Sequence, residues 1–323
     1  MPFSFDPTVD RGRRHLIGTG LATTALAVAG SVSAADNKVW LDYDQATLDK
    51  VYDQVNYAPN IKVVLGRYAT NSDITRARLG EPKRLAYGES KVEALDLYPA
   101  ASQNAPIHIF IHGGAWRAGS AQSYGFLADP FVARGAHMVI PDFTNVLEND
   151  GNLMPMTEQV RRCIAWVYQN AESFGGDKNR IYLSGHSSGG HLGGVAVTTD
   201  WEKEYGVAAD VIKGAVLISG MFDLKPVRLS SRGNYVAFTD EIEQALSSQR
   251  HLDKLNTPVV LVYGDQETPE FMRQSKDFAA AAQKAGKSVQ LIEGKGYNHF
   301  EIAETLANPF GIAGFAALKQ MKL

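Results

Sequence analysis

The chain has 323 residues, of which 45% are hydrophobic and 21% are charged, which is the composition of an ordinary globular protein. This composition excludes a disordered chain, a collagen-like repeat and a disulfide scaffold, and Cys163 is the single cysteine. The formal net charge of -3 offers no basic field for nucleic acid, so we expect no nucleic-acid partner.

The first 34 residues have the pattern of an export signal. The pair Arg13-Arg14 resembles a twin-arginine signal, residues 16–32 are apolar and uncharged, and residues 32–34 (Val-Ser-Ala) offer a small-residue cleavage site. The apolar run is rich in Gly, Ala and Thr and is too weak for a good membrane span. We therefore expect a signal peptide at 1–34, a periplasmic or secreted protein, and no stable membrane span after the signal is removed.

After the signal, residues 46–52 have the pattern of a short amphipathic helix, and residues 57–60 (Tyr-Ala-Pro-Asn) are expected to end it. From Lys91 onward, short apolar runs bounded by Gly, Pro or Asn predict strands buried on both faces. These strands are expected at 93–98, 107–111, 138–141, 180–184, 214–219, 259–263 and 288–292.

Helical patterns alternate with these strands. They are expected at 157–173, 188–199, 241–246, 270–285 and 309–321. The alternation predicts an α/β fold with a mostly parallel sheet, and no Pro/Gly/Ser-rich linker divides it, so we expect one catalytic domain over 35–323. The segment 221–252 is long for a simple connection and is expected to form part of a cap or pocket wall.

The strongest chemical motif is Gly-His-Ser-Ser-Gly at 185–189, which fits Gly-x-Ser-x-Gly. A predicted strand precedes it and a predicted helix follows it, which is the context of a nucleophile at a sharp strand-to-helix turn. The N-terminus of that helix favours developing negative charge. Ser187 is the centre of the motif and is the expected nucleophile, ahead of Ser188.

A second motif, His-Gly-Gly-Ala-Trp at 112–116, follows the predicted strand 107–111. Its glycines free backbone N–H groups, so Gly113 and Gly114 are expected to form an oxyanion hole together with the N–H of Ser188. His112 is expected to hold the loop by hydrogen bonding. Trp116 is either a wall of the substrate pocket or a packing residue, and we favour the wall.

The acid and the base should follow the nucleophile in that order. The strand 259–263 ends in a turn that carries Asp265 and Glu267, and both are candidates for the acid, whereas Glu270 is expected to open the next helix. The loop after the strand 288–292 carries His299, which is the only histidine after these acids and is the expected base.

The remaining sulfur and imidazole groups are expected to be structural. Cys163 lies in an apolar-periodic run and is expected to pack within a helix. His186 and His191 flank the nucleophile but lack carboxylate or cysteine partners at ligand spacing, so we expect no metal. The glycine-rich stretch 185–194 lacks a Walker lysine and Rossmann spacing, so no nucleotide and no other cofactor is expected.

In these motifs the chain resembles the α/β-hydrolase superfamily, and most of all its arylformamidase (kynurenine formamidase) and esterase/lipase branch with an HGG-x-W loop. The resemblance runs from about Leu48 to the C-terminus. Glu267 begins Glu-Thr-Pro-Glu-Phe where the family commonly has Asp-Ser-Pro-Glu-Phe, which implies that Glu267 is the acid and Asp265 the second choice. Ala115 stands where tyrosine is common. The implied fold is a mostly parallel central sheet with helices on both faces.

Residues and resemblance together predict a serine hydrolase that acts on carboxylic esters through Ser187, His299 and Glu267. The alternative is an arylformamidase or amidase that cleaves N-formyl aryl amines with the same triad. Both act on a small-molecule ester or amide. A third hypothesis, a catalytically silent binding protein, is disfavoured because the nucleophile, an acid and the base all occur in order.

Overall fold

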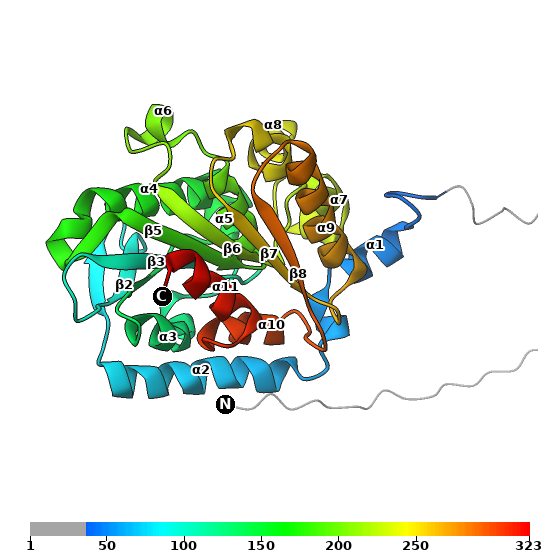
Figure 1. Ribbon diagram of the computed structural model, residues 1–323. Helices are drawn as coiled ribbons and strands as arrows, with labels where there is room; N and C mark the ends of the chain where they lie inside the picture. Colours follow the sequence, from blue (N-terminus) through cyan, green and yellow to red (C-terminus); the bar gives the residue numbers. More distant parts are fainter. Residues whose placement is uncertain (1–36) are drawn as a thin grey trace, which may run out of the picture. The chain divides into compact units, whose positions relative to one another are not determined.

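The structure, a computed structural model, describes residues 37–323, and the predicted export signal at 1–34 lies outside them. Across these residues one eight-stranded sheet has the order β1-β2-β4-β3-β5-β6-β7-β8, with β2 antiparallel to both of its neighbours and the other pairs parallel (Figure 1). The strands are β1 (Lys83–Ala86), β2 (Ala94–Tyr98), β3 (Ala105–Ile111), β4 (His137–Pro141), β5 (Gly176–His186), β6 (Ile212–Ile218), β7 (Val259–Gly264) and β8 (Val289–Gly294).

The strands predicted from apolar runs are confirmed as β2 to β8, and β5 begins earlier than expected, at Gly176. The edge strand β1 was not predicted, because its residues Lys83–Ala86 are largely exposed and have no apolar run. The α/β architecture with a mostly parallel sheet is therefore as the sequence predicts.

Helices cover both faces of the sheet, since alternate strand residues point to opposite sides. The α-helices are α1 (Gln45–Val51), α2 (Ile61–Leu79), α3 (Ala128–Val132), α4 (Met154–Asn170), α5 (Ser188–Val197), α6 (Trp201–Tyr205), α7 (Leu224–Leu229), α8 (Asp240–Leu246), α9 (Pro269–Lys284), α10 (Glu301–Glu304) and α11 (Ile312–Met321). In β5 and β6, Leu183 and Leu217 belong to one apolar cluster with α4, α5 and α9, whereas Tyr182 and Val216 belong to a second cluster with α2, α3 and α11 (Figure 1).

The helix α2 is the main difference from the prediction, which placed no helix between residue 60 and the first predicted strand at 93–98. It extends over 19 residues. Polar side chains hold it to the domain: Ser72 donates to the carbonyl of Ser123 at 3.1 Å and Thr75 donates to Asp129 at 2.9 Å. The buried face thus contains Ser and Thr, and for this reason the apolar periodicity that announces most surface helices is missing.

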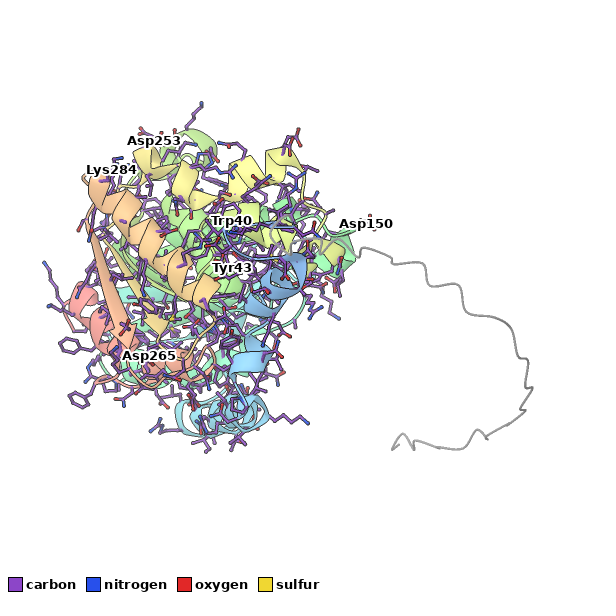
Figure 2. All side chains as sticks on the ribbon, turned by 90° about the vertical axis from the view of Figure 1, so that its right-hand side faces the viewer. Trp40, Tyr43, Asp150, Asp253, Asp265 and Lys284 are labelled. Carbon is purple, nitrogen blue, oxygen red and sulfur yellow. The ribbon has the colours of Figure 1, made fainter. Side chains whose placement is uncertain are left out.

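The first described residues lie beside α9. A single bridge pairs Trp40 with Tyr43, and the guanidinium of Arg273 lies 5.5 Å from the centre of the Trp40 ring (Figure 2). The predicted short helix at 46–52 follows as α1. Cys163 is buried within α4, as expected for a packing residue, and burial raises the pKa of its thiol. Within 37–323, no helix combines the length and the apolar character needed to cross a membrane.

Candidate active site

The turn between β5 and α5 presents Ser187 in a constrained backbone conformation. Its φ of 58° and ψ of -122° lie outside the regions that side chains other than glycine usually adopt. The neighbouring positions need glycine because a Cβ there would clash with backbone atoms. A Cβ on Gly185 would lie 2.3 Å from the carbonyl oxygen of Gly189, and one on Gly189 would lie 2.1 Å from that of Ile111. The turn therefore holds the serine hydroxyl in a fixed position at the end of the strand.

His299 joins the serine to a carboxylate. Its Nε2 lies 2.8 Å from Ser187 Oγ, and its Nδ1 lies 2.8 Å from Glu267 Oε2. All three side chains are buried. With a carboxylate against Nδ1, that nitrogen carries the proton and Nε2 is free to accept from the serine hydroxyl. The loops that follow β5, β7 and β8 thus bring the three residues into one hydrogen-bonded chain.

Glu267 is fixed by donors that the sequence did not suggest. Its Oε1 accepts from the hydroxyl of Ser219 at 2.5 Å and from the N–H of Gly264 at 2.7 Å, while Gln54 Nε2 lies 3.4 Å from Oε2. Ser219 ends the predicted strand 214–219, at the sheet edge where the acid was expected. Its position in the sequence could therefore have marked it as a hydrogen-bond partner of the acid. Gln54 lies 213 residues from Glu267 in the chain, and no local pattern marks it.

Asp265, the other candidate acid, lies elsewhere. Its Oδ1 accepts from the N–H of Gly296 at 2.7 Å, and its carboxylate lies 3.8 Å from Lys295 Nζ. In Figure 2 it is found toward the end of α9 that lies away from Lys284. Of the two acids, only Glu267 is hydrogen-bonded to His299 among the described residues.

His186 and His191 take structural positions beside the serine. His186 Nε2 donates to the carbonyl of His299 at 2.7 Å, which ties the histidine loop to the turn of the nucleophile. His191 accepts from the indole N–H of Trp116 at 3.1 Å and donates to the carbonyl of Leu246 at 3.0 Å. Burial lowers the pKa of both rings, to about 4 for His191, so they are neutral near neutral pH.

The His112–Trp116 loop lies against the nucleophile turn. A Cβ on Gly113 would lie 2.8 Å from the carbonyl oxygen of His186, so this close approach needs glycine. Gly114 has a φ of 129°. The N–H groups of Gly113 and Gly114 donate to no backbone oxygen within residues 37–323, which leaves them for a ligand. His112 Nδ1 lies 3.0 Å from the carbonyl of Gly113, consistent with the expected role in holding the loop.

Trp116 differs from the expectation that it forms a wall of the pocket. Its side chain is buried, its ring packs edge-on against His191 and Phe238, and its N–H is bonded to His191. It does not appear among the described residues that line the cavity. The physical reason is that the indole N–H has its acceptor in the buried His191, so the ring packs there and does not face the cavity.

A cavity of about 840 Å³ opens over Ser187 and His299, which are among the residues that line it. Besides Ser187 and His299, residues of several further elements line this cavity. Among these elements are α1, the 3-10 turn Gln54–Tyr57, α2 and the 3-10 turn Ser231–Asn234. The segment 221–252 therefore does form part of the wall, as expected. Lining residues include Asp49, Lys50, Asp53, Gln54, Tyr68, Gly113, Gly114, Arg117, Tyr124, Ser187, Arg232, Tyr235 and His299.

Comparison with known proteins shows which family the chain is similar to. The family model BD-FAE matches residues 95–282, which is more than half of the chain. The kynurenine formamidase of Danio rerio is 34% identical over 229 residues, covering 69% of this chain and 75% of the relative. That of Salmo salar is 34% identical over 230 residues, covering 69% and 76%.

Solved structures show the same fold. An esterase from Pyrobaculum calidifontis superposes with a TM-score of 0.64 at 18% identity, covering 86% of this chain and 97% of that chain. The resemblance in motifs, the sheet order and these matches agree, and the chain is a hydrolase. It belongs to the α/β-hydrolase esterase family described by the model BD-FAE, with kynurenine formamidases among its relatives.

Proposed function

We propose that this protein hydrolyses carboxylic esters through a Ser187–His299–Glu267 triad. The observation that carries the proposal is the continuous pair of 2.8 Å hydrogen bonds from serine to histidine to carboxylate, in which the serine and the histidine line an open cavity. In this arrangement the histidine takes the serine proton as the hydroxyl attacks the carbonyl carbon, and an ester bond to the enzyme forms as the alcohol leaves with that proton.

Each neighbour has a defined part in this cycle. Glu267 holds the histidine tautomer and stabilises the imidazolium, while Ser219 and Gly264 keep its other oxygen in place. The free N–H groups of Gly113 and Gly114, with that of Ser188 at the start of α5, stabilise the tetrahedral oxyanion. Water, activated by the same histidine, then releases the acid and restores the serine.

The first test is hydrolysis of 4-nitrophenyl acetate and butyrate by the protein, by Ser187→Ala and by Ser173→Ala, an exposed serine outside the cavity. We expect Ser187→Ala to lower kcat by about 10⁴-fold or more and the control to keep it. A fluorophosphonate probe should label the wild type at Ser187. Full activity in Ser187→Ala would remove the nucleophile assignment, and a folded wild type without labelling or turnover would remove the esterase proposal.

An aryl formamidase is the second candidate, because the relatives at 34% identity are kynurenine formamidases. The same triad would cleave an N-formyl aryl amine, with the formyl group on the serine. Rates on an N-formyl aniline and a phenyl ester separate the two proposals. A preference for the formamide of about tenfold or more in kcat/KM would favour the formamidase.

We also propose that the protein is exported and acts in the periplasm or outside the cell, on the basis of Arg13-Arg14 and the apolar residues 16–32. Expression with and without Arg13→Lys plus Arg14→Lys, followed by fractionation, tests this. Loss of the exported fraction in the double variant supports the proposal, and unchanged distribution contradicts it.

A further inference from the structure

Arg232, in the 3-10 turn Ser231–Asn234, is a buried cation in the wall of the active-site cavity. Its side chain lies near two aromatic rings: the guanidinium carbon is 5.7 Å from the centre of the Trp116 ring and 5.8 Å from that of Phe271. Phe271 in turn packs edge-on against the ring of His299, with centres 4.9 Å apart. The charge is therefore one ring away from the proposed base.

Only some of the N–H donors of this guanidinium make hydrogen bonds within the protein. Nη1 donates to the hydroxyl of Tyr235 and Nη2 donates to the carbonyl of Tyr52, both at 2.9 Å. Nε is buried and has no partner. Each Nη carries a second N–H, so donors remain after these two neutral acceptors are counted. Buried arginines are normally paired with a carboxylate, because a guanidinium loses much of its hydration on burial.

No carboxylate of residues 37–323 makes that pair within 4.0 Å. The acids of the cavity wall are occupied by other donors. Asp49 accepts from the N–H of Ser231 at 2.6 Å, and Asp53 accepts from the N–H of Val55 at 3.1 Å. A second guanidinium, that of Arg117, lies 4.6 Å from the centre of the Tyr235 ring and likewise has no carboxylate partner among the described residues.

We propose that Arg232 is a specificity-determining residue that binds a carboxylate on the substrate. This inference rests on the proposed hydrolase function and adds a substrate class to it: esters or amides that carry a carboxylate away from the scissile bond. The remaining N–H groups of the guanidinium can match two carboxylate oxygens, and the burial of Arg232 strengthens such a charge-assisted hydrogen bond. The hydroxyl of Tyr235 accepts a hydrogen bond from Arg232 and so orients its guanidinium. The exposed Arg117, whose guanidinium lies over the Tyr235 ring, adds a second positive charge to the cavity wall.

The test compares substrates that differ only in this charge. One pair is 4-acetoxybenzoate and its methyl ester, with the carboxylate on the leaving group. The other is mono-4-nitrophenyl adipate and its methyl ester, with the carboxylate on the acyl group. We expect the wild type to prefer the anion by about tenfold or more in kcat/KM in one of the pairs. Benzoate should inhibit hydrolysis of the neutral esters competitively, and benzamide should not.

Variants then assign the preference to Arg232. Arg232→Gln should raise KM for the preferred anion and lower its kcat/KM about tenfold or more, while the neutral partner changes less than about threefold. Arg232→Lys should restore part of the preference, because it keeps the charge without the fork. Arg134→Gln removes the same charge from an exposed position outside the cavity and should leave both substrates unchanged.

The outcomes separate the two proposals. If the neutral esters are hydrolysed but neither anion is preferred and benzoate does not inhibit, the carboxylate site is wrong and the esterase stands. If Arg232→Gln lowers anion and neutral ester equally, Arg232 is a structural support for Tyr52 and Tyr235, and the inference is again overturned. If no ester or formamide is turned over by folded protein, the proposed function itself fails.

Discussion

At the scale of single residues, the acid of the proposed triad is assigned by the hydrogen-bond donors that each carboxylate contacts. Glu267 accepts hydrogen bonds from His299, Ser219 and Gly264, whereas Asp265 accepts from Gly296 on the outside of the same turn. The longer glutamate side chain reaches back beneath the histidine loop. The local pattern left the two acids open and the family resemblance favoured Glu267, while in the folded turn only Glu267 is hydrogen-bonded to His299 among the described residues.

This assignment predicts that substitutions of Glu267 lower the rate of ester hydrolysis far more than substitutions of Asp265. Glu267→Gln should lower kcat for ester hydrolysis by about 10³–10⁴-fold, because the amide neither fixes the correct tautomer nor stabilises the imidazolium. Glu267→Asp should lose less, since it keeps the charge but shortens the reach. The matched control is Asp265→Asn, which should stay within about twofold of the wild type. A large loss in the control with little loss in Glu267→Gln would reverse the assignment.

At the scale of elements, the β5–α5 turn depends on close contacts between backbone segments that leave no room for a Cβ. Gly185 meets the carbonyl of Gly189 and Gly189 meets that of Ile111. These contacts join the turn to the end of β3, so the nucleophile and the Gly113 loop are held by the same packed backbone. Rigidity of this kind is what an oxyanion hole requires, because its donors must be in place before charge develops.

Alanine substitutions test this packing. Gly185→Ala should lower the free energy of unfolding by about 1–3 kcal/mol, because its Cβ would lie 2.3 Å from a carbonyl oxygen in fixed backbone. Gly66→Ala in α2 is the control: its Cβ would meet nothing within 4 Å, and removing a helical glycine should stabilise by about 0.5–1 kcal/mol. Urea unfolding measures both. Equal effects would show that the turn has room to relax.

At the scale of the whole molecule, buried neutral histidines make stability depend on pH. Burial lowers the pKa of His108 to about 3 and of His191 to about 4, from 6.5. The unfolded chain therefore binds protons that the folded chain refuses between about pH 6.5 and about pH 4, so stability falls as the pH is lowered through this range. For His191 the loss is on the order of 3 kcal/mol.

Urea unfolding at pH 7, 6, 5 and 4.5 measures this slope. His191→Gln keeps a polar side chain between Trp116 and Leu246 but does not titrate, so the variant should show a shallower loss between pH 6.5 and 4 even if its stability at pH 7 is lower. A free energy of unfolding that stays constant from pH 7 to 5 in the wild type would contradict the expectation.

The same scale shows what the sequence could and could not predict. Strands β2 to β8 and the order of serine, acid and histidine follow from apolar runs and motifs, because those signals are local. The helix α2 was missed because Ser72 and Thr75 occupy its buried face. Gln54, Arg232 and the packing of Trp116 depend on contacts with residues far away in the chain, and no window of sequence contains both partners.

The spacing of the triad along the chain has a consequence for biosynthesis. Ser187 emerges from the ribosome well before Glu267, and His299 emerges later still, on the loop that follows the last strand of the sheet. A nascent or prematurely terminated chain that ends before residue 299 therefore lacks the proposed base. With the proposed triad, hydrolytic activity is expected only after the loop that carries His299 has packed against His186, which follows the synthesis of residue 299.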